Sequence, residues 1–218
     1  MEIIMRFPFA LVSFVLFTRA LTAGSDEAAS TSAIVRELNL ARQNPTRYAE
    51  IAQEMRTTYN GRYLTFPGGT RLYTKEGSRS IDEAIRFLRS TGPLQPLAYS
   101  GGMSHGAADH CADQAGGGFS HTGRDGSNPG MRMNRYGTWG LGWGENISYG
   151  KTSARDVVLA LIIDDGLRGR KHRKNIFNPK FNFVGAAFGP HARFGSVCTM
   201  DFAGAYVERD ERSLVAKF

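Results

Sequence analysis

Hydrophobic residues recur at helical spacing in several separate stretches of this chain. One helix is predicted to begin at Thr31 or Ser32 and to stop at Asn44, because Pro45 disfavours helical backbone in the residue before it. Pro45 itself suits the first turn of a second short helix, which continues through Ala52. Further helices are predicted over residues 80–88, 100–115 and 154–163.

Later in the chain the pattern changes to that of β-strands. Residues 181–188 and 196–202 are strand-like, and the Gly- and Pro-containing stretch 189–195 between them resembles a hairpin connection. Residues 60–77 are rich in Gly, Pro and Thr and predict a long loop, and residues 166–174 predict another.

The N-terminus has the pattern of a secretory signal peptide. Arg6 supplies a short positive region, residues 7–17 are almost continuously apolar, and small residues at Ala20, Ala23 and Gly24 suit a signal peptidase. The apolar run is shorter than the ~20 residues that a membrane-spanning helix needs. We therefore expect residues 1–24 to be a leader and the protein to be secreted, or periplasmic or cell-surface in a bacterium. The remaining boundaries are a mobile lead-in at 25–31, one folded domain at 32–207 and a charged tail at 208–218.

The composition is that of one globular domain with an excess of basic residues. The formal net charge of the 218 residues is +7, and the Lys and Arg residues are scattered apart from one cluster at 168–174. A nucleic-acid-binding protein more often concentrates its basic residues on one helix or between aromatics, so nucleic acid is not an expected partner. Attraction to an anionic membrane or cell-wall surface, or a plain solvated surface, accounts better for the charge.

The two cysteines leave two alternatives open. Cys111 lies in a predicted helix and Cys198 in a predicted strand, and an oxidising compartment permits a disulfide between them. Two buried free thiols are the alternative, since cysteine also behaves as a small core residue. His105 and His110, in the same helix as Cys111, are five residues apart and diverge around it, so we expect both at the surface or on the rim of the cleft.

The polar groups with most chemical potential lie between residues 121 and 172. His121, Glu145 and His172 each occur in a short motif rich in turn residues, and Asp164 or Asp165 ends the apolar helix between them. Imidazole and carboxylate are ligand types for a divalent metal such as zinc, but the same groups could be joined by hydrogen bonds alone. Trp139 and Trp143, set among glycines, are expected to cover this cleft.

These motifs resemble those of the CAP superfamily, the cysteine-rich secretory, antigen 5 and pathogenesis-related proteins, also called SCP-like domains. The resemblance covers roughly residues 32–202 and is closer in style to the bacterial and protist branch. It is carried by the ordered set Asn39–Arg42 with Asn44–Pro45, Phe119–Gly123, Gly144–Ile147, His172–Ile176 and Phe183–Phe188.

The resemblance implies an α+β fold, a three-layer α-β-α sandwich with a central antiparallel sheet. It also implies an extracellular protein with a large cleft lined by two histidines and two acids. By motif these are His121, Glu145 and His172, with Asp164 as the first choice for the second acid and Asp165 as the second choice. Other members have Glu or Ser at that point, so the Asp is a departure from the family pattern.

The expected function is an extracellular binding module for a sterol, fatty acid or other apolar ligand or lipid. A divalent metal, Zn or Mg, is the implied cofactor, with His121, Glu145, Asp164 and His172 as the predicted ligand set. A metal-dependent hydrolase acting on peptide or cell-wall material is one alternative, with Glu145 as base. A protein-interaction module with a purely structural cleft is the other. No serine or cysteine in the motif region has the setting of an activated nucleophile, so no catalytic residue is assigned.

Overall fold

The structure is a computed structural model that describes residues 30–66 and 69–209. The predicted leader, most of the lead-in and nearly all of the C-terminal tail lie outside the described residues. The helices are α1 (Thr31–Gln43), α2 (Pro45–Arg56), α3 (Ser78–Ser90), α4 (Gly101–Gln114), α5 (Pro129–Met133), α6 (Ala154–Ile163) and α7 (Lys171–Ile176).

The central sheet has four strands in the order β4-β6-β7-β5. Its strands are β4 (Ala98–Tyr99), β5 (Gly137–Tyr149), β6 (Phe183–His191) and β7 (Gly195–Glu208). β6, β7 and β5 pair antiparallel, and only the two-residue β4 runs parallel to its neighbour β6. The predicted antiparallel sheet is therefore confirmed, with one short parallel strand at its edge.

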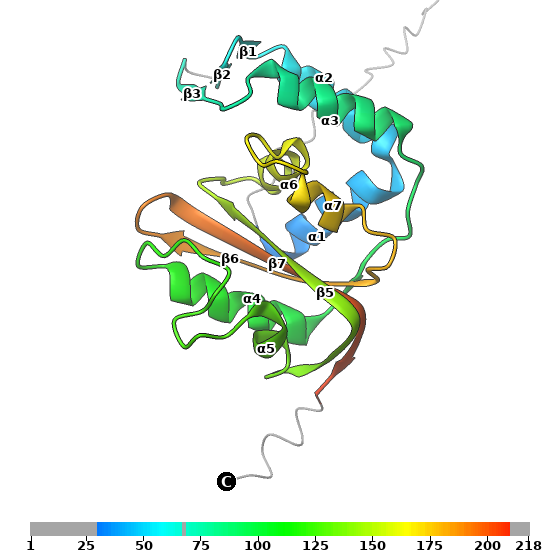
Figure 1. The fold of residues 1–218 in the computed structure, drawn as a ribbon, viewed down its shortest axis with the longest axis vertical. Helices are drawn as coiled ribbons and strands as arrows, with labels where there is room; N and C mark the ends of the chain where they lie inside the picture. Colours follow the sequence, from blue (N-terminus) through cyan, green and yellow to red (C-terminus); the bar gives the residue numbers. More distant parts are fainter. Residues whose placement is uncertain (1–29, 67–68, 210–218) are drawn as a thin grey trace, which may run out of the picture.

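Helices cover both faces of this sheet, which gives the predicted three-layer α+β sandwich (Figure 1). On one face α4 and α5 pack through residues such as Met103, Ala107 and Met133. On the other face α1 and α6 pack against alternate residues of β6 and β7, with α2 and α3 outside them. The larger core is therefore on the α1 and α6 side, where α6 is apolar on nearly every side and seven of its ten residues are buried.

The alternation of β7 explains the state of the cysteines. Cys198 belongs to the core on the α6 side of the sheet, whereas Cys111, on α4, packs on the opposite side next to Thr199. Successive strand residues point to opposite faces, so the sheet itself separates the two side chains. Both cysteines are free and buried. Of the two alternatives that the sequence leaves open, the disulfide is therefore wrong and the pair of buried thiols is correct.

The described parts of the predicted loop, residues 60–66 and 69–77, contain regular structure. They contain most of a small antiparallel sheet of β1 (Tyr59–Asn60), β2 (Tyr63–Thr65) and β3 (Arg71–Tyr73). Its strands are too short and too exposed for the alternating pattern to show in the sequence. The expectation of a loop over this stretch is corrected accordingly.

The connection after α6 also differs from the predicted loop, since it contains the short helix α7. Buried Arg42 fixes the far end of that helix, donating to the carbonyls of Ile176 at 2.6 Å and Asn178 at 3.1 Å. Burial lowers the pKa of Arg42 to about 10. The arginine of the Asn39–Arg42 motif thus holds in place an element far along the chain.

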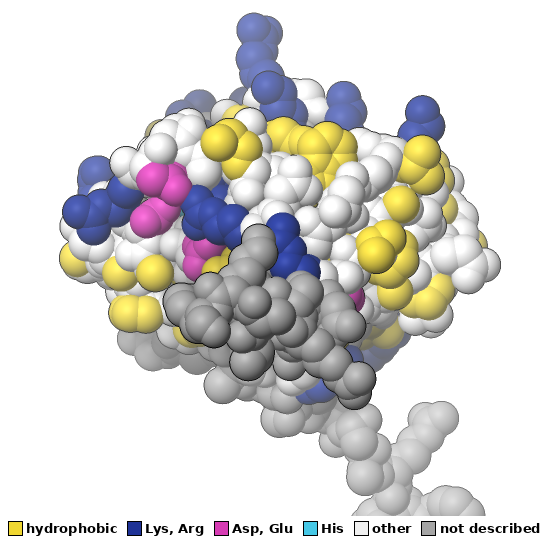
Figure 2. Space-filling view, turned by 90° about the horizontal axis from the view of Figure 1, so that it is seen from below, with side chains coloured by type: hydrophobic (Ala, Val, Ile, Leu, Met, Phe, Trp, Pro, Cys, Tyr) yellow, Lys and Arg dark blue, Asp and Glu magenta, His cyan; other side chains and the backbone are white. Residues whose placement is uncertain are grey.

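Basic side chains are dispersed over one face of the molecule. On the face seen from below in Figure 1, Lys and Arg lie in separate places between hydrophobic and uncharged groups (Figure 2). Within residues 30–66 and 69–209 there is no helix with the length and apolar character needed to cross a bilayer.

Candidate functional site

Three of the four predicted site residues, His121, Glu145 and His172, line an open pocket of about 970 Å³ beside β5, which forms one edge of the central sheet. Residues 119–122, which follow α4, form one side of the pocket, and α7 with Leu167 forms the other. Contributions from both helical layers therefore meet at this edge. We call it the histidine pocket; it is lined by Phe119, Ser120, His121, Thr122, Glu145, Ile147, Tyr149, Leu167, Lys171, His172, Lys174 and Asn175.

Two neighbouring residues of β5 connect the two sides. Glu145 contacts α5 and the 119–122 segment, whereas the side chain of Asn146 contacts α7. This division follows from the alternation of side chains along a strand. One strand therefore positions both histidines, each through a different face of the sheet.

Glu145 holds His121. Its Oε1 lies 2.6 Å from His121 Nδ1, and its Oε2 accepts a hydrogen bond of 2.5 Å from Arg132 Nη2. The Glu145 side chain is only 2% exposed and that of Arg132 is fully buried, whereas the His121 ring is 58% exposed. The buried ion pair fixes the carboxylate, and the carboxylate fixes one nitrogen of an accessible imidazole.

Behind this pair lies a second buried carboxyl group. Asp201 stands opposite Glu145 in the β5–β7 register and is fully buried. Neither of its oxygens accepts a hydrogen bond from the described residues. Burial, reinforced by the nearby Glu145 charge, raises the pKa of Asp201 well above its ordinary value, so the neutral acid is favoured and can donate to Glu145.

His110 is buried, which corrects the expectation that it lies at the surface; His105 is exposed as expected. The His110 Nε2 lies 2.8 Å from the Ser120 carbonyl, and it must carry the proton because a carbonyl only accepts. Burial lowers the pKa of His110. The neutral ring therefore anchors the residue next to His121.

Asp164 holds His172 in the same way that Glu145 holds His121. Its Oδ1 lies 2.7 Å from His172 Nδ1, and its Oδ2 accepts from the His172 backbone N–H at 3.0 Å. Asp165 faces elsewhere and accepts from the backbone N–H groups of Lys75 and Glu76. Asp164 has left-handed backbone, with φ of 55°, and this turn separates the two neighbouring carboxylates.

The two asparagines tie α7 to β5. Asn146 donates to the His172 carbonyl at 3.0 Å, and Asn175 donates to Asn146 Oδ1 at 2.8 Å and to the Glu145 carbonyl at 3.3 Å. Both amides therefore fix the backbone around the pocket.

An aromatic cluster forms the apolar end of the pocket. The Phe119 ring lies 4.8 Å from that of Tyr149 and 6.0 Å from that of Phe194 (centroid distances), and Phe119 is 70% exposed. Trp139 and Trp143, expected to cover the cleft, pack instead beside Gly130 of α5. The apolar wall of the pocket thus comes from other aromatic residues.

The geometry limits which of the predicted residues could bind a metal ion together. Within the part of the chain that the structure describes, no three His, Cys, Asp or Glu side chains are arranged to hold one ion. Both carboxylates contact a histidine Nδ1 atom, and Glu145 also contacts a guanidinium. The four-residue ligand set therefore stays a prediction, and the observed pairing suits carboxylates that orient imidazoles.

The CAP family, described as the cysteine-rich secretory protein family, matches residues 83–202, more than half of the 218-residue chain. The chain therefore belongs to the CAP family. A search of curated proteins found no match.

Several solved structures are similar in part. An extracellular SCP-domain protein of Bacillus anthracis shares 20% identity, with a TM-score of 0.40 over 58% of this chain and 37% of its own. An outer surface protein of Borrelia burgdorferi shares 16% identity, with a TM-score of 0.42 over 58% of this chain and 86% of its own. A cysteine-rich secretory protein of Staphylococcus aureus shares 13% identity, with a TM-score of 0.39 over 63% of this chain and 42% of its own.

Proposed function

We propose that this chain is an exported CAP-domain binding protein whose histidine pocket takes a lipid-type amphiphile, with a long-chain fatty acid as the best fit. The basic and apolar pattern of residues 1–24 supports export. The fatty acid follows from the two kinds of wall in the pocket, which is the observation that carries the proposal.

One end of the pocket is apolar and the other is cationic or titratable. Phe119, Ile147 and Tyr149 supply an apolar wall, while Lys171 and Lys174 lie on the α7 side with His172. A volume of about 970 Å³ is at the upper end of the usual range for small-molecule sites. A fatty acid would place its carboxylate near the lysines and its chain along the aromatics, whereas a sterol offers only a hydroxyl to the polar end.

A divalent metal, where one binds, would be held by His121 and His172. Their Nδ1 atoms face Glu145 and Asp164, which leaves Nε2 as the ligand atom of each ring. Carboxylates that orient metal-binding histidines in this way raise the basicity of the rings. The metal would supply a positive charge for an anionic head group.

The hydrolase alternative receives less support from the geometry. Its base would be Glu145, whose two oxygens already contact His121 and Arg132. Neither oxygen is therefore within free reach of a water that the base would have to deprotonate. We therefore propose binding in preference to turnover.

The test is equilibrium dialysis of labelled palmitate against the mature protein, with labelled cholesterol as a second ligand. Palmitate should bind saturably, and F119A should weaken it about tenfold or more through the loss of buried aromatic surface. Val207, as exposed as Phe119 at 70% but outside the pocket, provides the control V207A, which should bind like the wild type. Equal affinities of F119A and V207A, or no saturable binding of either ligand, would overturn the proposal.

A further inference from the structure

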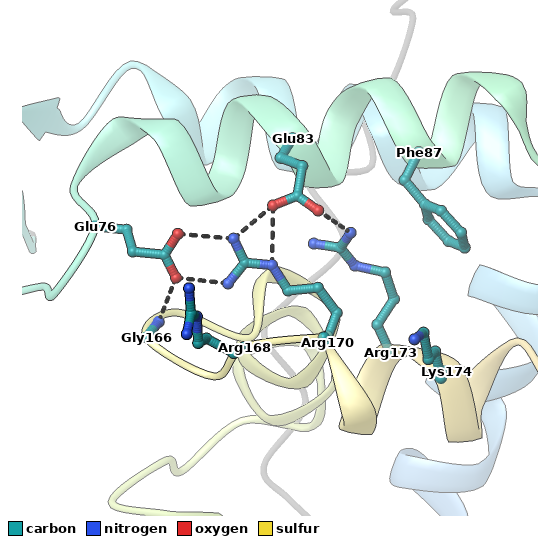
Figure 3. A pocket seen from close by; sticks show the side chains of 9 residues that line it. Glu76, Glu83, Phe87, Gly166, Arg168, Arg170, Arg173 and Lys174 are labelled. Atoms are coloured by element: carbon teal, nitrogen blue, oxygen red, sulfur yellow. Dashed lines mark hydrogen bonds and ion pairs between the residues drawn. The ribbon is translucent and has the colours of Figure 1, made fainter.

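A second pocket, of about 740 Å³, lies between α3 and the segment that runs from Gly166 into α7. Figure 3 shows four basic side chains in a row along this segment, facing Glu76, Glu83 and Phe87. We call it the arginine pocket. Lys174 borders both the arginine pocket and the histidine pocket. Arg168 borders only the arginine pocket of these two.

The middle of the row is neutralised by ion pairs. Arg170 donates to both oxygens of Glu76, at 2.6 and 2.8 Å, and to Glu83 at 2.5 and 2.9 Å. Arg173 donates to the other oxygen of Glu83 at 3.0 Å. The hydrogen bonds from Arg170 lower the pKa of Glu76 to about 2, so this carboxylate remains ionised. Both acidic groups of the pocket are therefore already occupied by arginines.

The two ends of the row carry the surplus charge. The lining has four cations, Arg168, Arg170, Arg173 and Lys174, against two carboxylates, which leaves a net charge of +2. Arg168 and Lys174 are exposed, and their side chains make no hydrogen bond or ion pair with the rest of the described chain. Figure 3 draws no dashed line from either of them to the other lining residues. Two cations are thus free to bind a ligand.

The segment that carries these residues is held rigidly. The Gly166 N–H donates to Glu76, and Arg170 Nη1 donates to the Asp164 carbonyl at 2.8 Å. Arg170 itself has left-handed backbone with φ of 49°, a conformation rarely adopted by residues other than glycine. A site whose backbone is fixed before binding loses less entropy when the ligand arrives.

An apolar surface adjoins the charged row. The Phe87 ring packs edge-on against Phe177, with 5.1 Å between centroids, and the Arg173 guanidinium carbon lies 5.1 Å from the Phe87 centroid. Phe87 is partly buried, so one part of the ring remains available to the pocket. The site can therefore accept an anion together with an apolar or aromatic substituent.

We propose that the arginine pocket binds a phosphate group carrying an organic substituent, attracted by the surplus charge that Arg168 and Lys174 supply at its two ends, with Phe87 against the substituent. A dianionic phosphate matches the surplus of two positive charges, and arginine is suited to phosphate geometry. The substituent could belong to a soluble phosphate ester or to a phospholipid head group. Of its charged residues, this site shares only Lys174 with the one proposed for a fatty acid.

The test is isothermal titration calorimetry of the mature protein with phenyl phosphate and with inorganic phosphate, and sedimentation with phosphatidylcholine vesicles that contain phosphatidic acid. Phenyl phosphate should bind more tightly than inorganic phosphate because of Phe87. R168A and K174A should each weaken phosphate binding about tenfold, through loss of one of the two surplus positive charges. Binding to the vesicles alone, with the same losses, would identify the lipid head group as the source of the phosphate.

Lys171 provides the matched control. It is an exposed lysine on the same short helix as Lys174, and it borders the histidine pocket but not the arginine pocket. K171A should bind phosphate like the wild type but palmitate more weakly. R168A should bind phosphate more weakly but palmitate like the wild type. If K171A loses as much phosphate affinity as R168A, or if no phosphate ligand binds the wild type in either assay, the arginine pocket is not a phosphate site.

Discussion

Arg132 donates a hydrogen bond of 2.5 Å to Glu145, and neither side chain is more than 2% exposed. The other oxygen of Glu145 contacts His121, so an arginine that never reaches the pocket surface sets the position of a histidine that does. Arg132 also donates to the carbonyls of Ser127 and His121. The buried Arg132–Glu145 pair therefore both stabilises the fold and positions His121 in the pocket.

Replacing Arg132 with alanine should be strongly destabilising. It would leave Glu145 buried without its cation, a loss of about 3–5 kcal/mol in the free energy of unfolding. Urea denaturation measures the change. Arg135 is the control, since it pairs with Asp109 and Asp125 but is 38% exposed, and R135A should lose no more than about 1 kcal/mol. Similar losses for the two variants would contradict the structural role of the buried pair.

The ion pairs of the arginine pocket should make stability depend on acid pH through Glu76. Its pKa falls from 4.5 to about 2 in the folded protein, chiefly through the hydrogen bonds from Arg170. A lowered pKa contributes stability above the ordinary value, and that contribution is lost as the pH falls towards 2. E76Q should therefore be less stable than the wild type at pH ~6, with a gap that closes below pH ~4.5.

Urea denaturation at a series of pH values measures this gap. E50Q is the control, because Glu50 pairs with Arg47 on an exposed helix surface. Such pairs contribute less than about 1 kcal/mol, so E50Q should differ little from the wild type at any pH. A gap between wild type and E76Q that stays constant from pH ~6 down to pH ~2 would show that the ionised Glu76 contributes nothing.

The cysteines should behave as two inert thiols. Burial raises the pKa of both Cys111 and Cys198, so the reactive thiolate is scarce as well as inaccessible. A thiol reagent such as DTNB should label neither residue in the native protein and both after unfolding in denaturant. Reductant should leave the melting temperature unchanged. A fall in melting temperature with reductant, or an intact mass that shows a bridge, would be inconsistent with their positions on opposite faces of the sheet.

Zinc should bind through the two accessible imidazoles. Added zinc should raise the melting temperature of the wild type, because a ligand that binds only the folded state stabilises it. H121A and H172A should each abolish the shift. H105A, which removes an exposed histidine outside the pocket, should keep it. A zinc shift of equal size in all four proteins would exclude the histidine pocket as the metal site.

The sequence predicts the long elements well, because their residues carry periodic information. The five longer helices (α1, α2, α3, α4 and α6) and the strands β6 and β7 lie where apolar spacing places them. Helix α7 does not, since its sequence KHRKNI has only one apolar residue and no stripe to detect. Its position depends on Arg42 and Asn146, which contact its backbone from elsewhere in the fold.

The sequence predicts the motif residues of the site but not the buried residues that position them. His121, Glu145 and His172 line one pocket, as their motifs indicate. Arg132 and Asp201 gave no comparable signal, because an arginine or aspartate becomes notable only when the fold buries it beside another charge. The choice between Asp164 and Asp165 likewise depends on one left-handed residue, which periodicity cannot reveal.

The most direct measurement is NMR observation of the imidazole signals of His121, His172 and His105 during titration with palmitate. If His121 and His172 border one ligand pocket, their signals should shift together and saturate at the same palmitate concentration, while that of His105 stays constant. Movement of only one of the two, or saturation at different concentrations, would contradict a single shared pocket.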